Sequence, residues 1–121
     1  MNYIRKHIFN LLNQYQDLAM QHKEWTENLT TSYITPTEFI AEWFDDIFNH
    51  GADELIKAGE ISIEEWEIIE PFHASFRAFA DEYYKNENSI PADMTTYEPW
   101  VVIAKTAAET VEKLEDLGWK L

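Results

Sequence analysis

Helix start signals recur along this chain of 121 residues, and apolar residues at three- and four-residue steps follow each of them. The clearest signal is the segment TPTE at 35–38, which places a threonine at the N-cap, a proline at the first helical position and a glutamate at the third. Ser62 and Glu65 repeat this spacing of hydroxyl and carboxylate. The alternating patterns of strands and the Asn-Gly or Asp-Gly turns of hairpins are absent from the sequence. The chain is therefore predicted to be all-α.

Four main amphipathic helices are expected, packed as a compact bundle or an orthogonal array in a single helical domain over residues 1–121. They are predicted over about residues 2–21, 35–50, 62–83 and 99–117, with a short turn or helix at 52–58 and loops at 24–32 and 86–96. Pro71 lies inside the third helix, where it cannot donate a backbone hydrogen bond and its ring clashes with the carbonyl four residues earlier. We therefore expect the third helix to be kinked or broken near Pro71.

The net charge of −14 is high enough to suggest a disordered chain, but the hydrophobic content argues against disorder. Aromatic residues make up 15% of the chain and hydrophobic residues 45%, which is enough for a packed core and unlike the composition of disordered acidic chains. The chain has no cysteine, which is compatible with a reducing compartment, and no apolar run long enough for a secretory signal or a membrane span. A cytoplasmic protein without membrane contact is expected.

The histidines give no pattern of a catalytic or metal site. Glu70 and His73 have the Glu-x-x-His spacing of di-iron carboxylate proteins, but such sites need a second copy of the motif, which the sequence lacks. His73 is therefore interpreted as a partly buried, hydrogen-bonded histidine. His7, His22 and His50 match no zinc spacing and are interpreted as surface or rim residues. The three glycines are explained as helix ends, which leaves no phosphate-binding loop, so we expect no catalytic residue, no metal and no cofactor.

Acidic residues are concentrated in one segment of the chain. Residues 38–70 hold eleven acids and one base, Lys57, and so carry a charge of −10 out of the total of −14. Direct binding of nucleic acid is disfavoured, because phosphate contacts need lysine or arginine. A patch of this charge would accelerate association with a basic protein. The residues expected to contact such a partner are Asp45, Asp46, Asp53, Glu54, Glu64 and Glu67.

Small, acidic, cysteine-free helical proteins with many aromatic residues resemble bacterial immunity proteins in general type. That resemblance implies an inhibitor that neutralises a basic partner, such as a nuclease toxin or another nucleic-acid enzyme, by covering its surface. Tyr33, Tyr97 and Trp119 are candidate anchors for the contact, since they lie in predicted loops or at a helix end.

Three alternatives stay open at this point. Anti-restriction and anti-CRISPR proteins that mimic the charge of DNA are similar in type, and they would show the same acidic pattern. A self-associating helical domain would complete the burial of an apolar face, such as residues 39–48, in a homodimer instead of remaining a monomer. A carboxylate and histidine metal enzyme built on Glu70 and His73 ranks last.

Overall fold

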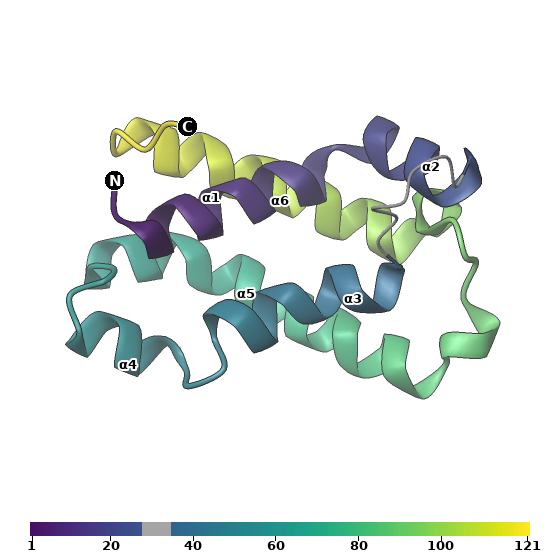
Figure 1. Ribbon diagram of the computed structural model, residues 1–121, viewed down its shortest axis with the longest axis horizontal. Helices are drawn as coiled ribbons and strands as arrows, with labels where there is room; N and C mark the ends of the chain where they lie inside the picture. Colours follow the sequence, from purple (N-terminus) through teal and green to yellow (C-terminus); the bar gives the residue numbers. More distant parts are fainter. Residues whose placement is uncertain (28–34) are drawn as a thin grey trace.

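The computed structural model describes residues 1–27 and 35–121 and is helical wherever it has regular structure (Figure 1). Its elements are α1 (Tyr3–Gln16), α2 (Leu18–Glu27), α3 (Pro36–Ala41), the π-helical turn η1 (Glu42–Ile47), α4 (Ala52–Lys57), α5 (Ile63–Lys85), the short 3₁₀ turns η2 (Glu87–Ser89) and η3 (Met94–Thr96), and α6 (Glu98–Asp116). Within these ranges there is no strand, so the all-α prediction is confirmed. None of the helices described combines the length and the apolar character that crossing a bilayer requires.

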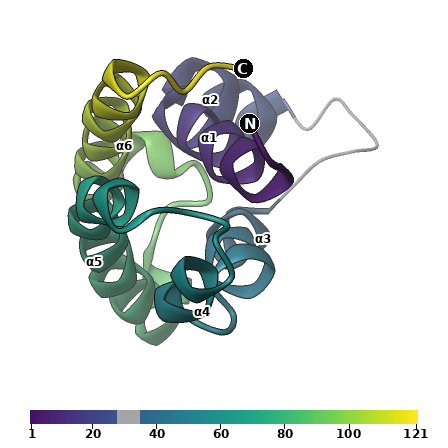
Figure 2. The ribbon, with the colours of Figure 1, turned by 90° about the vertical axis from the view of Figure 1, so that its left-hand side faces the viewer.

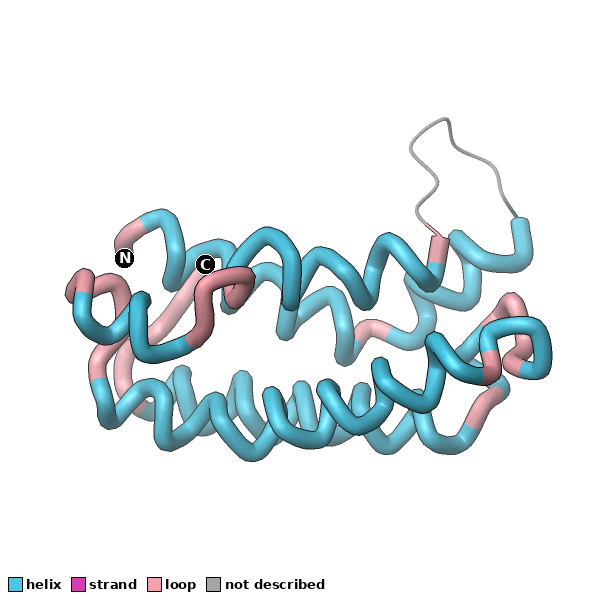
Figure 3. The backbone as a smooth tube through the Cα atoms, turned by 90° about the horizontal axis from the view of Figure 1, so that it is seen from below, coloured by secondary structure: helices cyan, strands magenta, loops and turns pink. Residues whose placement is uncertain are grey.

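The helices surround one aromatic core. α6 packs between α1 and α5, and α3 with η1 closes the side opposite α6, as the view along the molecule shows (Figure 2). The long helices run along a shared axis, and most connections gather at the two ends (Figure 3). The largest fully buried side chains include Trp43, Trp100, Tyr15 and Phe72. The Tyr15 hydroxyl keeps a hydrogen bond inside this core, because it donates to the carbonyl oxygen of Phe39 at 2.8 Å.

The first helix does not run unbroken to Gln21 as predicted, because α1 ends at Gln16 and α2 begins at Leu18. The Asp17 carboxylate accepts a hydrogen bond from the backbone N–H of Met20 at 3.1 Å and so caps α2. The buried Gln21 amide donates to the carbonyl oxygens of Gln14 at 2.6 Å and of Tyr15 at 2.9 Å at the end of α1, and the Gln14 carbonyl also accepts from the backbone N–H of Asp17 at 3.2 Å. A side chain thus replaces the helical hydrogen bonds lost at the break.

Part of the loop predicted at 24–32 is helical. α2 extends to Glu27, and Trp25 lies in that helix with 8% of its surface exposed. Leu29, which the sequence also suggested as a core contact, lies outside the described residues, as does Tyr33.

The second predicted helix begins as expected and then widens. Thr35 accepts a hydrogen bond from the backbone N–H of Glu38 at 3.2 Å, which caps α3. In η1 the backbone N–H of Phe48 donates to the carbonyl oxygen of Trp43 at 3.2 Å, five residues back instead of four. The wider turn brings the two aromatic rings within 4.9 Å of each other, and both are buried.

The predicted break at Pro71 is wrong, because α5 is continuous from Ile63 to Lys85. Ser62 and Glu65 form the predicted capping box at its start, which fixes where the helix begins. Pro71 has no backbone N–H, so the carbonyl of Glu67 loses the donor that it would have in a regular helix. Both residues are exposed, so water can donate to that carbonyl instead. A bend without a break stays a prediction.

The chain returns to the core after α6. Tyr97, and neither Thr96 nor Glu98, holds the N-cap position of this helix. Gly118 has a φ of +98°, a left-handed conformation that glycine adopts without strain, and the backbone N–H of Trp119 then bonds back to the carbonyl of Leu114 at 3.1 Å. Trp119 is 5% exposed and packs edge-on against Phe9. It is therefore a core residue, not the surface anchor that the sequence suggested.

Candidate functional site

One carboxylate of the acidic segment is used to hold the fold together. The Glu65 carboxylate accepts hydrogen bonds from Nε and Nη2 of Arg5, each at 2.9 Å, and from the backbone N–H of Ser62 and Nε1 of Trp119, each at 2.7 Å. Burial alone would raise the pKa of Glu65, but the bonds from Arg5, Ser62 and Trp119 outweigh it and hold the pKa below its usual value. Glu65 therefore links α1, α5 and the residues after α6, and its carboxylate is already occupied by these hydrogen bonds.

The other ten carboxylates of 38–70 are not neutralised in this way. Among residues 1–27 and 35–121, the ion pair of Glu65 with Arg5 is the only one that a carboxylate of this segment makes. All six residues predicted to contact a partner are exposed. They lie on η1, on the first turn of α4 and near the start of α5: Asp45, Asp46, Asp53, Glu54, Glu64 and Glu67. These three elements follow one another along the same half of the molecule (Figure 1).

The two aspartates of η1, Asp45 and Asp46, are neighbours in a helix, so their side chains leave it in different directions. Burial and then the charge of Asp46 raise the pKa of Glu42. Burial and then the charge of Asp45 raise the pKa of Tyr84 in the last part of α5. The six predicted residues thus form a band around η1, α4 and the start of α5, and the two aspartates do not point at one common spot.

Sequence reasoning missed a place where a histidine joins two of these acids among the residues that the structure describes. His7 of α1 and Glu42 and Asp46 of η1 each offer a ligand atom, and the three atoms lie within 4.8 Å of one another. The Nδ1 atom of His7 is buried and has no hydrogen-bond partner among the residues described. His7 had been interpreted as a surface or rim residue, although it is only partly exposed. The four-residue spacing of Glu42 and Asp46 was visible, but the position of α1 beside η1 was not.

His73 has the structural role that its position predicted. Nε1 of Trp43 donates to Nδ1 of His73 at 3.0 Å, so this nitrogen carries no proton and its lone pair is already engaged. Burial, and then the positive charge of Arg77, lower the pKa of His73 to about 4. The ring is packed among Trp66 and Phe48, at centroid distances of 5.2 and 4.9 Å. This pairing explains His73 without a metal ion.

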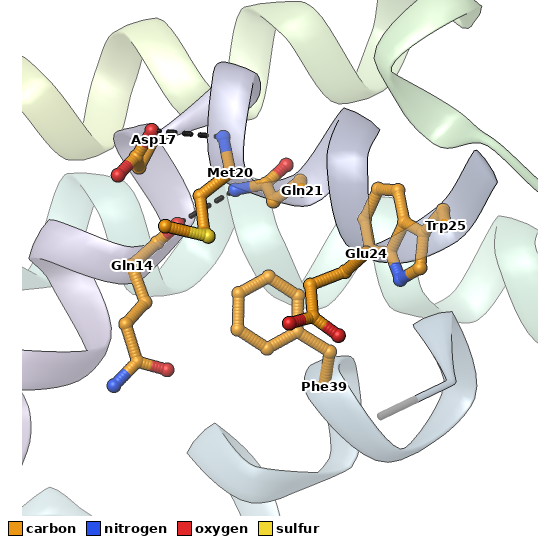
Figure 4. A pocket seen from close by; sticks show the side chains of 7 residues that line it. All are labelled: Gln14, Asp17, Met20, Gln21, Glu24, Trp25 and Phe39. Atoms are coloured by element: carbon orange, nitrogen blue, oxygen red, sulfur yellow. Dashed lines mark hydrogen bonds between the residues drawn. The ribbon is translucent and has the colours of Figure 1, made fainter. Parts of the chain in front are cut away.

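A pocket of about 200 Å³ opens at the break between α1 and α2. Phe39 and Trp25 line it together with Met20 and four polar side chains, which Figure 4 labels. The hydrogen bonds drawn there are those from Met20 to Asp17 and from Gln21 to Gln14, which hold the break in place. The pocket therefore belongs to the structure of the break and gathers no set of catalytic groups.

Comparison with known proteins gives no match: no protein-family model, no curated protein and no solved structure is similar to this chain. Function is therefore inferred from the geometry and charge of the residues described above.

Proposed function

We propose that this chain is a protein-binding module of the inhibitor or immunity type, which covers a basic surface of its partner with the carboxylates of η1, α4 and the start of α5. The observation that carries the proposal is the state of those carboxylates. Ten of the eleven acids in 38–70 form no ion pair with any described residue, and Lys57 is the single base among them. The partner would be a basic protein such as a nuclease toxin or another nucleic-acid enzyme, met in the cytoplasm by a monomer.

Like charges held this close work against the folded state, because groups within a Debye length of about 10 Å are only partly screened. The raised pKa of Glu42 shows this cost locally, since the charge of Asp46 contributes to it after burial. Lysine and arginine side chains of a partner would remove the repulsion and speed the encounter. Binding therefore relieves a strain that the free protein carries.

The self-associating alternative loses its main support. The apolar face at 39–48 is packed inside the chain, where Phe39, Trp43, Ile47 and Phe48 are at most 5% exposed. Mimicry of DNA keeps its support, because a protein that binds nucleic acid would recognise the same band of carboxylates. Both remaining forms, toxin neutralisation and mimicry of DNA, use the same band of carboxylates, and the identity of the partner distinguishes them.

The test compares two variants with the same change in net charge. The band variant neutralises four exposed acids of α4 and α5: Asp53→Asn, Glu54→Gln, Glu64→Gln and Glu67→Gln. The control variant neutralises four exposed acids of α6: Glu109→Gln, Glu112→Gln, Glu115→Gln and Asp116→Asn. Each protein is immobilised, exposed to a lysate of the source organism at low salt, and eluted at high salt for identification by mass spectrometry. The purified candidate partner is then titrated against all three proteins.

We expect one basic protein that binds the wild type and the control variant equally well and binds the band variant at least about tenfold more weakly. A tenfold loss of affinity corresponds to about 1.4 kcal/mol, which is the size of one lost charged contact. Competition by a DNA duplex for the same partner would show that the carboxylates cover the partner's nucleic-acid-binding surface, which both forms of the proposal allow. Equal weakening in both variants would mean that net charge alone matters, and the proposed site would then be wrong.

A further inference from the structure

We propose that His7, Glu42 and Asp46 form a binding site for a divalent first-row transition-metal ion, with water in the remaining coordination positions. The site goes beyond the protein-binding function, since it recognises a small cation through a histidine that the band of carboxylates does not include. It joins α1 to η1, two elements that pack against each other.

The geometry brings three donors to one point. Their ligand atoms lie within 4.8 Å of one another. Donors bound to one ion at about 2.1 Å in a tetrahedral arrangement lie about 3.4 Å apart, so each pair must approach by no more than about 1.5 Å. Asp46 is exposed and Glu42 is half-buried, so rotation of their side chains can supply this movement without a shift of the backbone.

The donor set selects the kind of cation. An imidazole nitrogen with two carboxylate oxygens suits zinc, manganese, iron or cobalt, whereas calcium takes six to eight oxygen ligands and magnesium takes oxygen alone. Three protein ligands, with water in the remaining positions, resemble the ligand count of catalytic zinc sites more than that of closed structural ones. The two negative charges of Glu42 and Asp46 would be balanced by the ion, and no lysine or arginine of the described residues balances them now.

The state of His7 is the second, independent observation. Its Nδ1 is closed off from solvent and makes no hydrogen bond with any described residue, although buried polar atoms of proteins are nearly always paired. The ring also lies beside the exposed ring of Tyr3, with centroids 5.7 Å apart. An ion beside the imidazole would give a reason for a histidine at this half-buried position.

The experiment is a calorimetric titration of the metal-free protein with ZnCl₂ and, separately, with MgCl₂. Binding of CoCl₂, followed by its visible absorption, reports whether an imidazole and oxygen ligands surround the ion. The site variants are His7→Gln, Glu42→Gln and Asp46→Asn. The matched controls are His50→Gln and Asp45→Asn, which remove an exposed histidine and an exposed acid next to the site but outside it. Circular dichroism without metal checks that each variant is folded, and the exposed position of Asp46 makes its variant the safest in this respect.

We expect one zinc ion per chain, no comparable binding of magnesium, and affinities at least about tenfold weaker in the three site variants than in the two controls. Equal affinity of zinc for the wild type and for Asp46→Asn, or equal binding of zinc and magnesium, would overturn the proposal. The band variant described above leaves all three ligands in place and should bind zinc as the wild type does. Loss of partner binding and loss of metal binding can therefore be told apart.

Discussion

Replacing Glu65 by glutamine tests how the two ends of the chain are held together. The carboxylate accepts hydrogen bonds from Arg5 of α1, from the backbone of Ser62 and from Trp119 after α6. Glutamine has nearly the same shape, but its amide group has lost the charge and places an N–H₂ donor where one of these donors points. At least one of the three groups must then lose its acceptor.

The size of the effect follows from these contacts. An unsatisfied buried donor costs about 1–3 kcal/mol, and each bond that loses a charged acceptor weakens by about 1 kcal/mol. Breaking one side of a buried ion pair costs about 3–5 kcal/mol in other proteins, and Glu65 and Arg5 are partly open to water, so the lower end applies. We therefore expect Glu65→Gln to reduce the free energy of unfolding by about 3 kcal/mol, which is a fall in Tm of roughly 10 °C for a domain of this size.

Urea unfolding followed by tryptophan fluorescence measures this quantity directly. The matched control is Glu64→Gln, because Glu64 is the adjacent, exposed glutamate in the same first turn. Its loss removes only a favourable charge near the start of α5, worth about 0.5 kcal/mol. A Glu65→Gln variant that is within 1 kcal/mol of the control, on the scale set by a single hydrogen bond, would refute the view that this carboxylate locks α1, α5 and Trp119 together.

Two further predictions concern α5. The pKa of His73 is lowered to about 4 in the fold, so the unfolded chain binds more protons than the folded one below pH 6.5, and stability should fall as the pH drops from about 6.5 towards 4. The free energy of unfolding should fall by about 2 kcal/mol over this range, after allowance for the partial exposure of His73 to water. Urea denaturation at a series of pH values measures this fall. It should be smaller in His73→Asn, because the amide of asparagine does not titrate and can still accept the hydrogen bond from Trp43. Pro71→Ala should raise the free energy of unfolding by about 1 kcal/mol, because the backbone N–H that it restores can bond to the exposed carbonyl of Glu67; a less stable variant would show that the proline shapes the helix.

Local signals in the sequence predicted the parts of the fold that depend on local chemistry. The caps at Thr35 and Ser62 are side-chain bonds to a backbone three residues away, and they are found where the spacing indicated. The break at Asp17 has a local cap of the same kind, from the backbone N–H of Met20 to the Asp17 carboxylate, but the prediction missed it because the break also has a long-range partner. It depends on Gln21, whose amide oxygen accepts from Nε1 of Trp100 at 2.7 Å, a contact across 79 positions of the chain.

The candidate site likewise has features that local signals predict and features that depend on the packing of the helices. Exposure of the six predicted acids follows from the polar faces of their own helices, and periodicity gives it directly. Their positions on different elements depend on how the elements pack, whereas the divergence of the adjacent Asp45 and Asp46 follows from local helical geometry. His7 lay outside the prediction because it belongs to another helix, and only the packing of α1 on η1 brings it to Glu42.

The wide turn of η1 leaves one residue that the core does not require. Trp43 and Phe48 pack together across a backbone hydrogen bond that spans five residues. An ordinary α-helix would bring two side chains to the same face with a spacing of four, and so with one residue fewer. η1 therefore has the form of a helix into which a single residue has been inserted, in a stretch whose exposed members are both aspartates. Insertions of this kind are frequent at functional sites, and here the extra residue also changes the spacing of charges on the surface.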